Sequence, residues 1–150
     1  MRKQKGFSLI ELLIVVAIIL IIAAIAIPNL LRSRIAANEA SAVGSVRTIN
    51  TAEVTYASTY PDVGFATLAS LGGAGGTSGA AGLLDSVLAG GTKSGYSFAT
   101  TVTGTPATTY ATHGNPLSSQ TGQRFFFSDQ SGVIRYNTSA VATATDNPLQ

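Results

Sequence analysis

The fold is decided by residues 6–31, which read GFSLIELLIVVAIILIIAAIAIPNLL. A single carboxylate, Glu11, precedes sixteen consecutive apolar residues, 12–27. As a helix, residues 7–31 extend about 37 Å, which exceeds the hydrocarbon core of a bilayer at about 30 Å. The preceding residues, MRKQK, carry three positive charges and no negative one, which favours a cytoplasmic location for that end. We therefore expect a membrane-spanning helix, with everything after about Leu31 outside the cytoplasm.

A small residue, Gly6, lies before the apolar run and not after it. A secretory signal has its small-residue cleavage site after the apolar segment, which is then discarded. Here Gly6 comes before the segment, so cleavage after Gly6 would leave Phe7 as a new N-terminus on an intact helix. The ordered motif GFSLIELL of residues 6–13 resembles the class III signal of type IV pilins and of the pseudopilins of type II secretion.

This resemblance covers about the first fifty residues, and it assigns roles to three of them. It implies that Gly6 is the cleavage glycine read by prepilin peptidase, a membrane aspartic protease. It implies that the new amine of Phe7 is N-methylated. It also matches Glu11 to the glutamate of the family.

Glu11 also has a physical interpretation of its own. A charged residue inside a membrane helix costs roughly 2.5–3.5 kcal/mol on insertion scales, so it usually has a partner or a function. In an isolated subunit Glu11 could instead reach water at the interface. When such helices pack together, an amine about 4 Å from the carboxylate stabilises it by roughly 4 kcal/mol at an effective dielectric constant of 20. The available cation is the Phe7 amine of a neighbouring chain, so Glu11 and Phe7 are predicted to set the register of assembly.

Pro28 interrupts the apolar helix. Proline lacks an N–H, and its ring clashes with the carbonyl four residues earlier, here that of Ala24. A kink is the simplest expectation. Resemblance to type IV pilins implies in addition a segment that unwinds during assembly. We predict a kinked but continuous helix in the membrane and local melting around Ala24 and Pro28 in the filament.

Beyond the apolar run the pattern becomes amphipathic and ends before Pro61, because a residue before proline avoids helical angles. The expected domains are a cleaved leader at 1–6, a transmembrane or filament-core helix at 7–31, its amphipathic continuation at 32–60 and a globular head at 61–150. Glu39 and Glu53 fall near the apolar stripe. Two interpretations stay open for them: ion pairs between subunits with Arg32, Arg34 or Arg47, and solvated charges on a polar face.

The head has an α+β pattern in which strand signals dominate its second half. Single helical turns are expected at 67–71 and 83–89, with a glycine-rich surface loop at 72–79 between them. Four strands, at 96–102, 107–112, 124–128 and 133–136, form a predicted antiparallel meander. Its turns are expected at 104–106, 114–116 and 129–132, and residues 138–150 are expected to be irregular. The sheet would pack against the outer part of the long helix, in a type IV pilin-like fold.

The amino-acid composition limits which binding partners and which kinds of chemistry are expected of this chain. Removing the three leader cations leaves six basic and seven acidic residues, a net charge of about minus one, so nucleic acid has no broad basic surface to bind. No cysteine is present, so the head lacks the disulfide of many pilins. Asp129 and Asp146 are weak candidates for calcium, and ordinary turn roles are favoured. His113 reads as a loop residue, and no catalytic motif occurs. We expect no enzyme activity, no metal and no cofactor.

The function expected from these features is that of a structural subunit of a type IV pilus, serving adhesion, motility or DNA uptake. The alternative is a pseudopilin of the type II secretion system, forming a periplasmic filament. A membrane-anchored enzyme or binding module is disfavoured, because an anchor would not require Glu11. The resemblance implies as partners identical subunits, the inner membrane, the prepilin peptidase and N-methyltransferase, an assembly platform with an ATPase motor, and an outer-membrane pore. The precursor would lie in the inner membrane and the assembled subunit in a surface filament, or in the periplasm for a pseudopilin.

Overall fold

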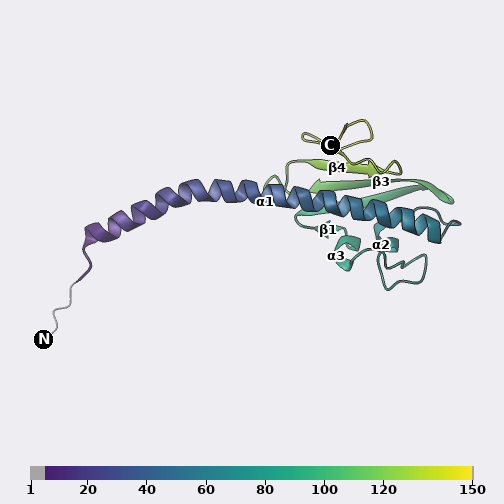
Figure 1. Ribbon diagram of the computed structural model, residues 1–150, viewed down its shortest axis with the longest axis horizontal. Coiled ribbons are helices and arrows are strands. Elements are labelled where there is room, and N and C mark those ends of the chain that lie inside the picture. The colour runs from purple at the N-terminus through teal and green to yellow at the C-terminus, as the bar shows by residue number, and fades with distance from the viewer. Residues whose placement is uncertain (1–5, 150) are drawn as a thin grey trace. The chain divides into compact units, whose positions relative to one another are not determined.

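The computed structural model describes residues 6–149 (Figure 1). Of the predicted leader, residues 1–5 lie outside the described residues. The chain divides into two compact units with a boundary between Arg34 and Ile35, and each is described by itself. The second unit contains the sheet, which confirms the expected α+β class.

One long helix, α1 (Leu9–Thr59), contains 51 residues and includes Pro28. It confirms the helix predicted for residues 7–60 to within two residues at each end. At its C-terminal end the N–H of Tyr60 still donates to the carbonyl of Tyr56 at 2.8 Å, and Pro61 follows. The helix stops there because a residue that precedes proline is driven out of helical angles.

The sheet has six antiparallel strands in sequential order. They are β1 (Thr92–Lys93), β2 (Tyr96–Gly104), β3 (Ala107–Pro116), β4 (Phe125–Asp129), β5 (Arg135–Asn137) and β6 (Asn147–Pro148). The predicted meander is confirmed as β2 to β5. The two-residue edge strands β1 and β6 were not predicted, because pairs this short carry no periodic signal.

The turn predicted at residues 114–116 is wrong. These residues belong to β3, where Pro116 pairs with Tyr96 and Gly114 pairs with both Phe98 and Phe126. A Cβ on Gly114 would lie 3.1 Å from the Phe98 ring, so the glycine makes room for an aromatic side chain rather than for a turn. The prediction of a loop position for His113 is wrong as well, since this residue lies in β3.

The remaining turns follow the sequence signals. At residues 129–132 the N–H of Gly132 donates to the carbonyl of Asp129 at 2.9 Å, and Gly132 has a φ of 72°. The two predicted helical turns are present as α2 (Leu68–Leu71) and α3 (Ser86–Ala89). No helix or named strand occurs at 72–79, as expected for the glycine-rich loop.

The C-terminal segment is more ordered than predicted. β6 pairs with β5, and the N–H of Leu149 donates to the carbonyl of Ile134 at 2.8 Å. Ala142 is completely buried. The C-terminal segment has only a weak periodic pattern in its sequence, and its order comes from tertiary contacts with β5 and the residues before it.

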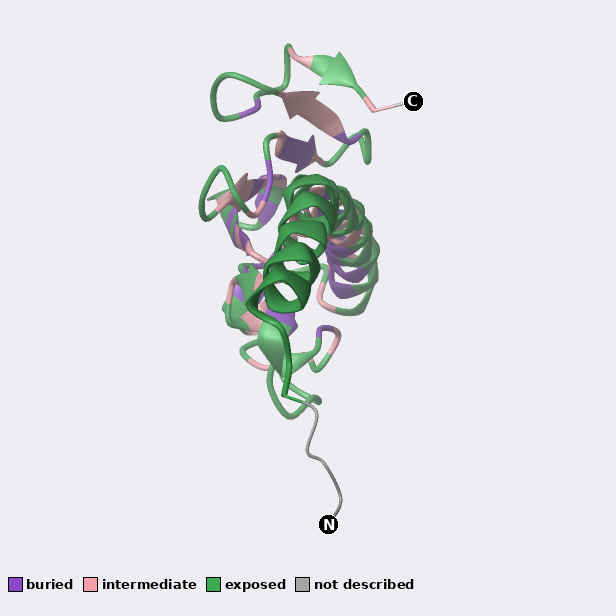
Figure 2. Ribbon diagram, turned by 90° about the vertical axis from the view of Figure 1, so that its left-hand side faces the viewer, coloured by how far each residue is buried: buried purple, intermediate pink, exposed green. Residues whose placement is uncertain are grey.

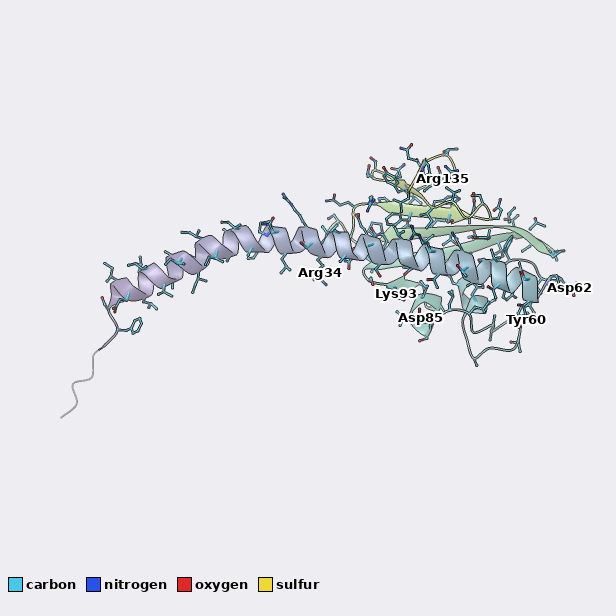
Figure 3. All side chains as sticks on the ribbon, viewed as in Figure 1. Arg34, Tyr60, Asp62, Asp85, Lys93 and Arg135 are labelled. Atoms are coloured by element: carbon cyan, nitrogen blue, oxygen red, sulfur yellow. The ribbon has the colours of Figure 1, made fainter. Side chains whose placement is uncertain are left out.

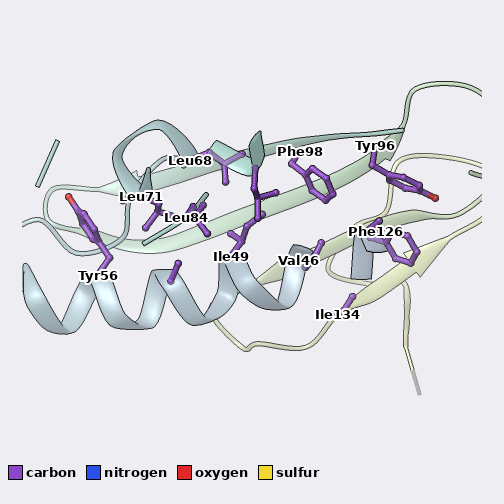
Figure 4. Close-up of a cluster of buried hydrophobic side chains, with 14 residues drawn as sticks. Val46, Ile49, Tyr56, Leu68, Leu71, Leu84, Tyr96, Phe98, Phe126 and Ile134 are labelled. Carbon is purple, nitrogen blue, oxygen red and sulfur yellow. The ribbon is translucent and has the colours of Figure 1, made fainter. Parts of the chain in front are cut away.

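The core lies between one face of the sheet and the second half of α1 (Figures 2 and 4). Val46, Ile49 and Tyr56 point from the helix toward the strands, and α2 and the segment before α3 complete the core. In β2 buried residues alternate with less buried ones, as expected for a strand with one covered face, whereas in β4 the three consecutive residues 126–128 are buried. Their labelled core side chains are Tyr96, Phe98 and Phe126.

Candidate functional site: the N-terminal segment and its helix

The predicted cleavage site lies just before the first turn of α1. Gly6, Phe7 and Ser8 are not helical, and all three are exposed. Phe7 is 82% exposed, and among the described residues no atom beyond the chain neighbours of Gly6 lies within 4 Å of a Cβ placed on it. The Gly6–Phe7 bond is therefore accessible in the described chain.

Glu11 contacts the start of its own helix. Its Oε2 accepts a hydrogen bond from the Ser8 N–H at 2.9 Å, and the Ser8 carbonyl accepts one from the Leu12 N–H at 3.2 Å. Ser8 is thus the N-cap of α1, and Glu11 occupies the third helical position. This contact was not predicted, although the spacing Ser-x-x-Glu is its known signature. The predicted pairing of Glu11 with the Phe7 amine of a neighbouring chain stays a prediction.

The first half of α1 has almost no covering from the rest of its own unit. Its large apolar side chains are exposed, and Figure 3 shows side chains projecting on all sides of this segment. By length and composition it is able to cross a membrane. Such a surface requires lipid or other apolar helices around it, because a large contiguous apolar patch is unfavourable in water.

Pro28 lies inside α1, and the helix is unbroken from Ala24 to Asn29. A long helix tolerates one proline when neighbouring backbone groups find other partners. The predicted melting of this segment concerns the filament and stays a prediction.

Glu39 pairs within its own chain, so both interpretations made from the sequence are wrong for it. Its Oε2 accepts from the Arg124 Nε at 2.7 Å, and its Oε1 accepts from the Gln123 and Arg124 backbone N–H groups at 2.9 and 3.2 Å. Burial alone would raise the pKa of this carboxyl, but these three hydrogen bonds and the Arg124 charge lower it below its ordinary value. Glu39 joins α1 to the entry of β4.

Glu53 is completely buried, so it neither forms an ion pair between subunits nor lies in solvent. Its Oε2 accepts from the Ala66 N–H at 3.0 Å, while its buried Oε1 has no partner among residues 6–149. Burial raises the pKa of this carboxyl to about 7, against the opposing effect of the Ala66 hydrogen bond. The head therefore contains a carboxyl group that titrates near neutral pH.

The other candidate residues have local roles. Asp129 accepts from the Ser131 N–H, and Asp146 accepts from Thr143 and from the Asn137 amide, as expected for turn residues. Within residues 6–149 no three His, Cys, Asp or Glu side chains gather to hold a metal ion. His113 packs edge-on against Phe127, and burial lowers its pKa. The two ion pairs of the described chain, Lys93–Asp85 and Arg124–Glu39, leave out Arg32, Arg34 and Arg47.

These features define a class of protein: a folded α+β head on a helix whose apolar half is uncovered and whose start carries an accessible Gly–Phe bond. Comparison with known proteins gives the family of that N-terminal segment. Residues 1–27 match the family model for the prokaryotic N-terminal methylation motif. The resemblance inferred from residues 6–13 is therefore confirmed for the N-terminal segment.

Two curated relatives are type IV pilus proteins. The chain is 67% identical over 39 residues to the type IV wide pilus major component PilA4 of Thermus thermophilus, a match that covers 26% of this chain and 30% of the relative. It is 43% identical over 54 residues to the type IV major pilin protein PilA of Myxococcus xanthus, covering 36% of this chain and 24% of the relative. The matched segment thus spans less than a third of either relative. No solved structure matches.

Proposed function

We propose that this chain is the precursor of a structural subunit of a type IV pilus. The observation that carries the proposal is the uncovered apolar half of α1, joined to a folded head and preceded by a methylation motif. A precursor of this kind would be held in the inner membrane by that helix. The assembled subunit would lie in a filament outside the cell.

Polymerisation would surround the exposed apolar half of α1 with other apolar helices. In the membrane lipid surrounds it, and in a filament identical helices replace the lipid. Since lipid and helices are similarly apolar, extraction yields little hydrophobic free energy, and an energy source is needed. The proposed partners are therefore identical subunits, the prepilin peptidase and N-methyltransferase, an assembly platform with an ATPase motor, and an outer-membrane pore.

The proposed site residues act at successive steps. Cleavage follows Gly6, methylation modifies the Phe7 amine, and Glu11 of one subunit pairs with the Phe7 amine of another. The segment around Ala24 and Pro28 unwinds as the helices pack. This role requires neither catalysis nor a cofactor.

Intact-mass spectrometry of filaments sheared from the cell surface tests the proposal. We expect a chain that begins at N-methylated Phe7, and a Glu11→Ala variant that is depleted from the sheared fraction. A processed chain found only in membranes would instead support the periplasmic pseudopilin. An uncleaved chain would contradict both.

A further inference from the structure

We propose that the head carries a head-to-tail interface between copies of this chain, in which the turn at residues 61–63 of one copy docks on Arg124 of the next. The inference rests on the proposed function and deepens it, because it names a contact between heads in addition to the packing of their helices. Both surfaces belong to the second compact unit, which begins at Ile35.

The two surfaces lie at opposite ends of this unit. At one end β2 begins with Tyr96, whose hydroxyl donates to the Arg124 carbonyl at 2.9 Å. At the other end β3 begins with Ala107, whose N–H donates to the Val63 carbonyl at 2.8 Å. Because β2 and β3 are antiparallel and β3 has ten residues, these two ends are about 30 Å apart. Figure 3 shows Asp62 beside the C-terminal end of α1.

Arg124 presents an unpaired edge of its guanidinium group. Its Nε donates to Glu39 at 2.7 Å, and its Cζ lies 5.6 and 5.7 Å from the centroids of the Phe126 and Tyr136 rings. These contacts hold the group in place. Its two Nη nitrogens have no hydrogen-bond partner among residues 6–149, and the side chain is 36% exposed. A fixed, planar guanidinium group of this kind binds a carboxylate with two parallel hydrogen bonds.

Glu39 leaves this edge available for a second carboxylate. One oxygen of Glu39 contacts the Arg124 Nε, and the other accepts the backbone N–H groups of Gln123 and Arg124 at 2.9 and 3.2 Å. The charge of Glu39 is thus shared among three donors, and the Nη groups are not among them. Arg124 also lines a hollow of about 620 Å³, which has room for more than one side chain of a partner.

The opposite end supplies a carboxylate and an apolar side chain on a fixed turn. Asp62 is exposed and forms no ion pair with any described residue, and Val63 is 41% exposed. The N–H groups of Val63 and Gly64 donate to the Tyr60 carbonyl at 3.0 and 3.1 Å, and the Val63 carbonyl is held by Ala107. A turn held in this way loses little conformational freedom when it docks.

A second copy therefore supplies the occupant of the hollow. Its Asp62 would accept hydrogen bonds from the Arg124 Nη groups, and its Val63 would enter the hollow beside Pro116 and Phe125, which line it. Because the two surfaces are different and lie at opposite ends, the contact is heterologous and repeats along an open chain of subunits. Copies in contact would be displaced by about 30 Å, the distance between the two ends.

Other exposed cations are weaker partners for Asp62. Arg32, Arg34 and Arg47 are exposed on α1 and form no ion pair in the described chain. A free, long side chain loses rotamer freedom when it pairs, which is why exposed ion pairs contribute little. Arg124 is already held by Glu39 and by two aromatic rings, so it loses less.

Cysteine crosslinking in sheared filaments tests the contact, because the chain has no cysteine of its own. The double variant Val63→Cys/Ser119→Cys places one thiol beside Asp62 and the other on an exposed residue that lines the hollow. A short bismaleimide should join successive copies and give a ladder of dimers, trimers and larger products on a denaturing gel. The matched control, Val63→Cys/Gln130→Cys, has its second thiol on an exposed residue outside the hollow and should stay monomeric.

Two crosslinking results would overturn the inference. Dimers from Val63→Cys alone would mean that like ends meet, which a head-to-tail contact excludes. A ladder from Val63→Cys/Ser33→Cys and none from Val63→Cys/Ser119→Cys would mean that the turn meets the helix beside Arg32 and Arg34 instead.

The yield of sheared filaments is a second measurement, and it decides the matter if a cysteine variant does not assemble. Asp62→Lys places like charges opposite each other, so the yield should fall about tenfold, whereas Asp62→Glu should stay near wild type. Gln130→Lys adds the same charge at another exposed position and should assemble normally. Equal yields from Asp62→Lys and Gln130→Lys would contradict the contact.

The failures of the two proposals are distinguishable. If the wild-type chain gives no surface filaments of subunits that begin at Phe7, the proposed function fails, and the contact fails with it. If wild-type filaments form, but neither the ladder nor the effect of Asp62→Lys is observed, the proposed function stands and the head-to-tail contact is overturned.

Discussion

The two halves of α1 belong to one helix but have opposite surroundings. Residues 9–34 carry large apolar side chains that are almost all exposed, whereas residues 35–59 bury a stripe that includes Val46, Ile49 and Tyr56 against the sheet. The second half is the less apolar of the two, yet it is the half that packs against the sheet of its own unit. Apolar content thus does not determine which half packs within the subunit.

What distinguishes the halves is how their apolar residues are arranged. In the first half they occupy every side, so no single face of a small head could cover them. In the second half they form one stripe, which matches the single apolar face of a sheet. The two halves should therefore respond differently to substitution.

The largest difference is expected from loss of a buried aromatic ring. Phe126 is 0% exposed, and its ring centroid lies 5.7 Å from that of Tyr96, so Phe126→Ala should lower the free energy of unfolding of the head by about 3–5 kcal/mol. Leu20→Ala, in the exposed half, should leave that free energy unchanged within about 0.5 kcal/mol. Chemical denaturation of the full chain in mild detergent, followed by near-UV circular dichroism, measures both.

An equal effect of Phe126→Ala and Leu20→Ala on the head would contradict the separation of the two halves. It would mean that the stability of the head depends on Leu20 as much as on a residue of its own core.

The next largest effect concerns pH. Burial raises the pKa of Glu53 from 4.5 to about 7, so between these values the folded head binds a proton more tightly than the unfolded chain does. Its contribution is fully present below pH 4.5, decreases as the pH rises and is lost above about 7, a difference of about 3 kcal/mol. Glu53→Gln should remove this decrease. Denaturation curves at several pH values from about 4 to 8 measure it.

Wild type must be compared with Glu53→Gln because other groups also make the stability of the head depend on pH. Burial lowers the pKa of His113, which makes stability rise with pH below about 6.5, opposite to Glu53. The lowered pKa of Glu39 acts at lower pH, where its stabilisation is lost as the carboxylate becomes protonated. Asp62 is exposed, so Asp62→Asn supplies a matched acid-to-amide variant as the control. If Glu53→Gln kept the wild-type slope, Glu53 would not be the responsible group.

The sequence predicted what depends on local pattern. The ends of α1 follow from proline and from the apolar run, and the turn at residues 129–132 follows from its aspartate and glycine. The same local reasoning failed at residues 114–116, because pairing with β2 and room for the Phe98 ring overrode a strong turn signal.

The surroundings of Glu39 and Glu53 could not be predicted from local sequence, because they depend on residues far away in the chain. Glu39 is 85 residues from Arg124, and no spacing rule connects them. Burial of Glu53 looked unfavourable, because a charged side chain rarely enters a core. The raised pKa resolves that difficulty, since the neutral acid is far less costly to bury. By contrast, the contact of Glu11 with Ser8 was available from the sequence alone.

The smallest effect concerns the uncovered face of the second half. Gly44 lies within α1 and is exposed, and a Cβ added to it would have no atom within 4 Å apart from its chain neighbours and the adjacent helix backbone, so Gly44→Ala should stabilise the head by about 0.5–1 kcal/mol. Thermal denaturation of the full chain measures this gain. The yield of sheared filaments from Gly44→Ala, relative to wild type, then tests whether the exposed face of the second half is covered on assembly. An unchanged yield would mean that the face around Gly44 stays open in the filament. A reduced yield from a more stable subunit would mean that another subunit approaches this backbone closely, so that the second half, like the first, is covered only on assembly.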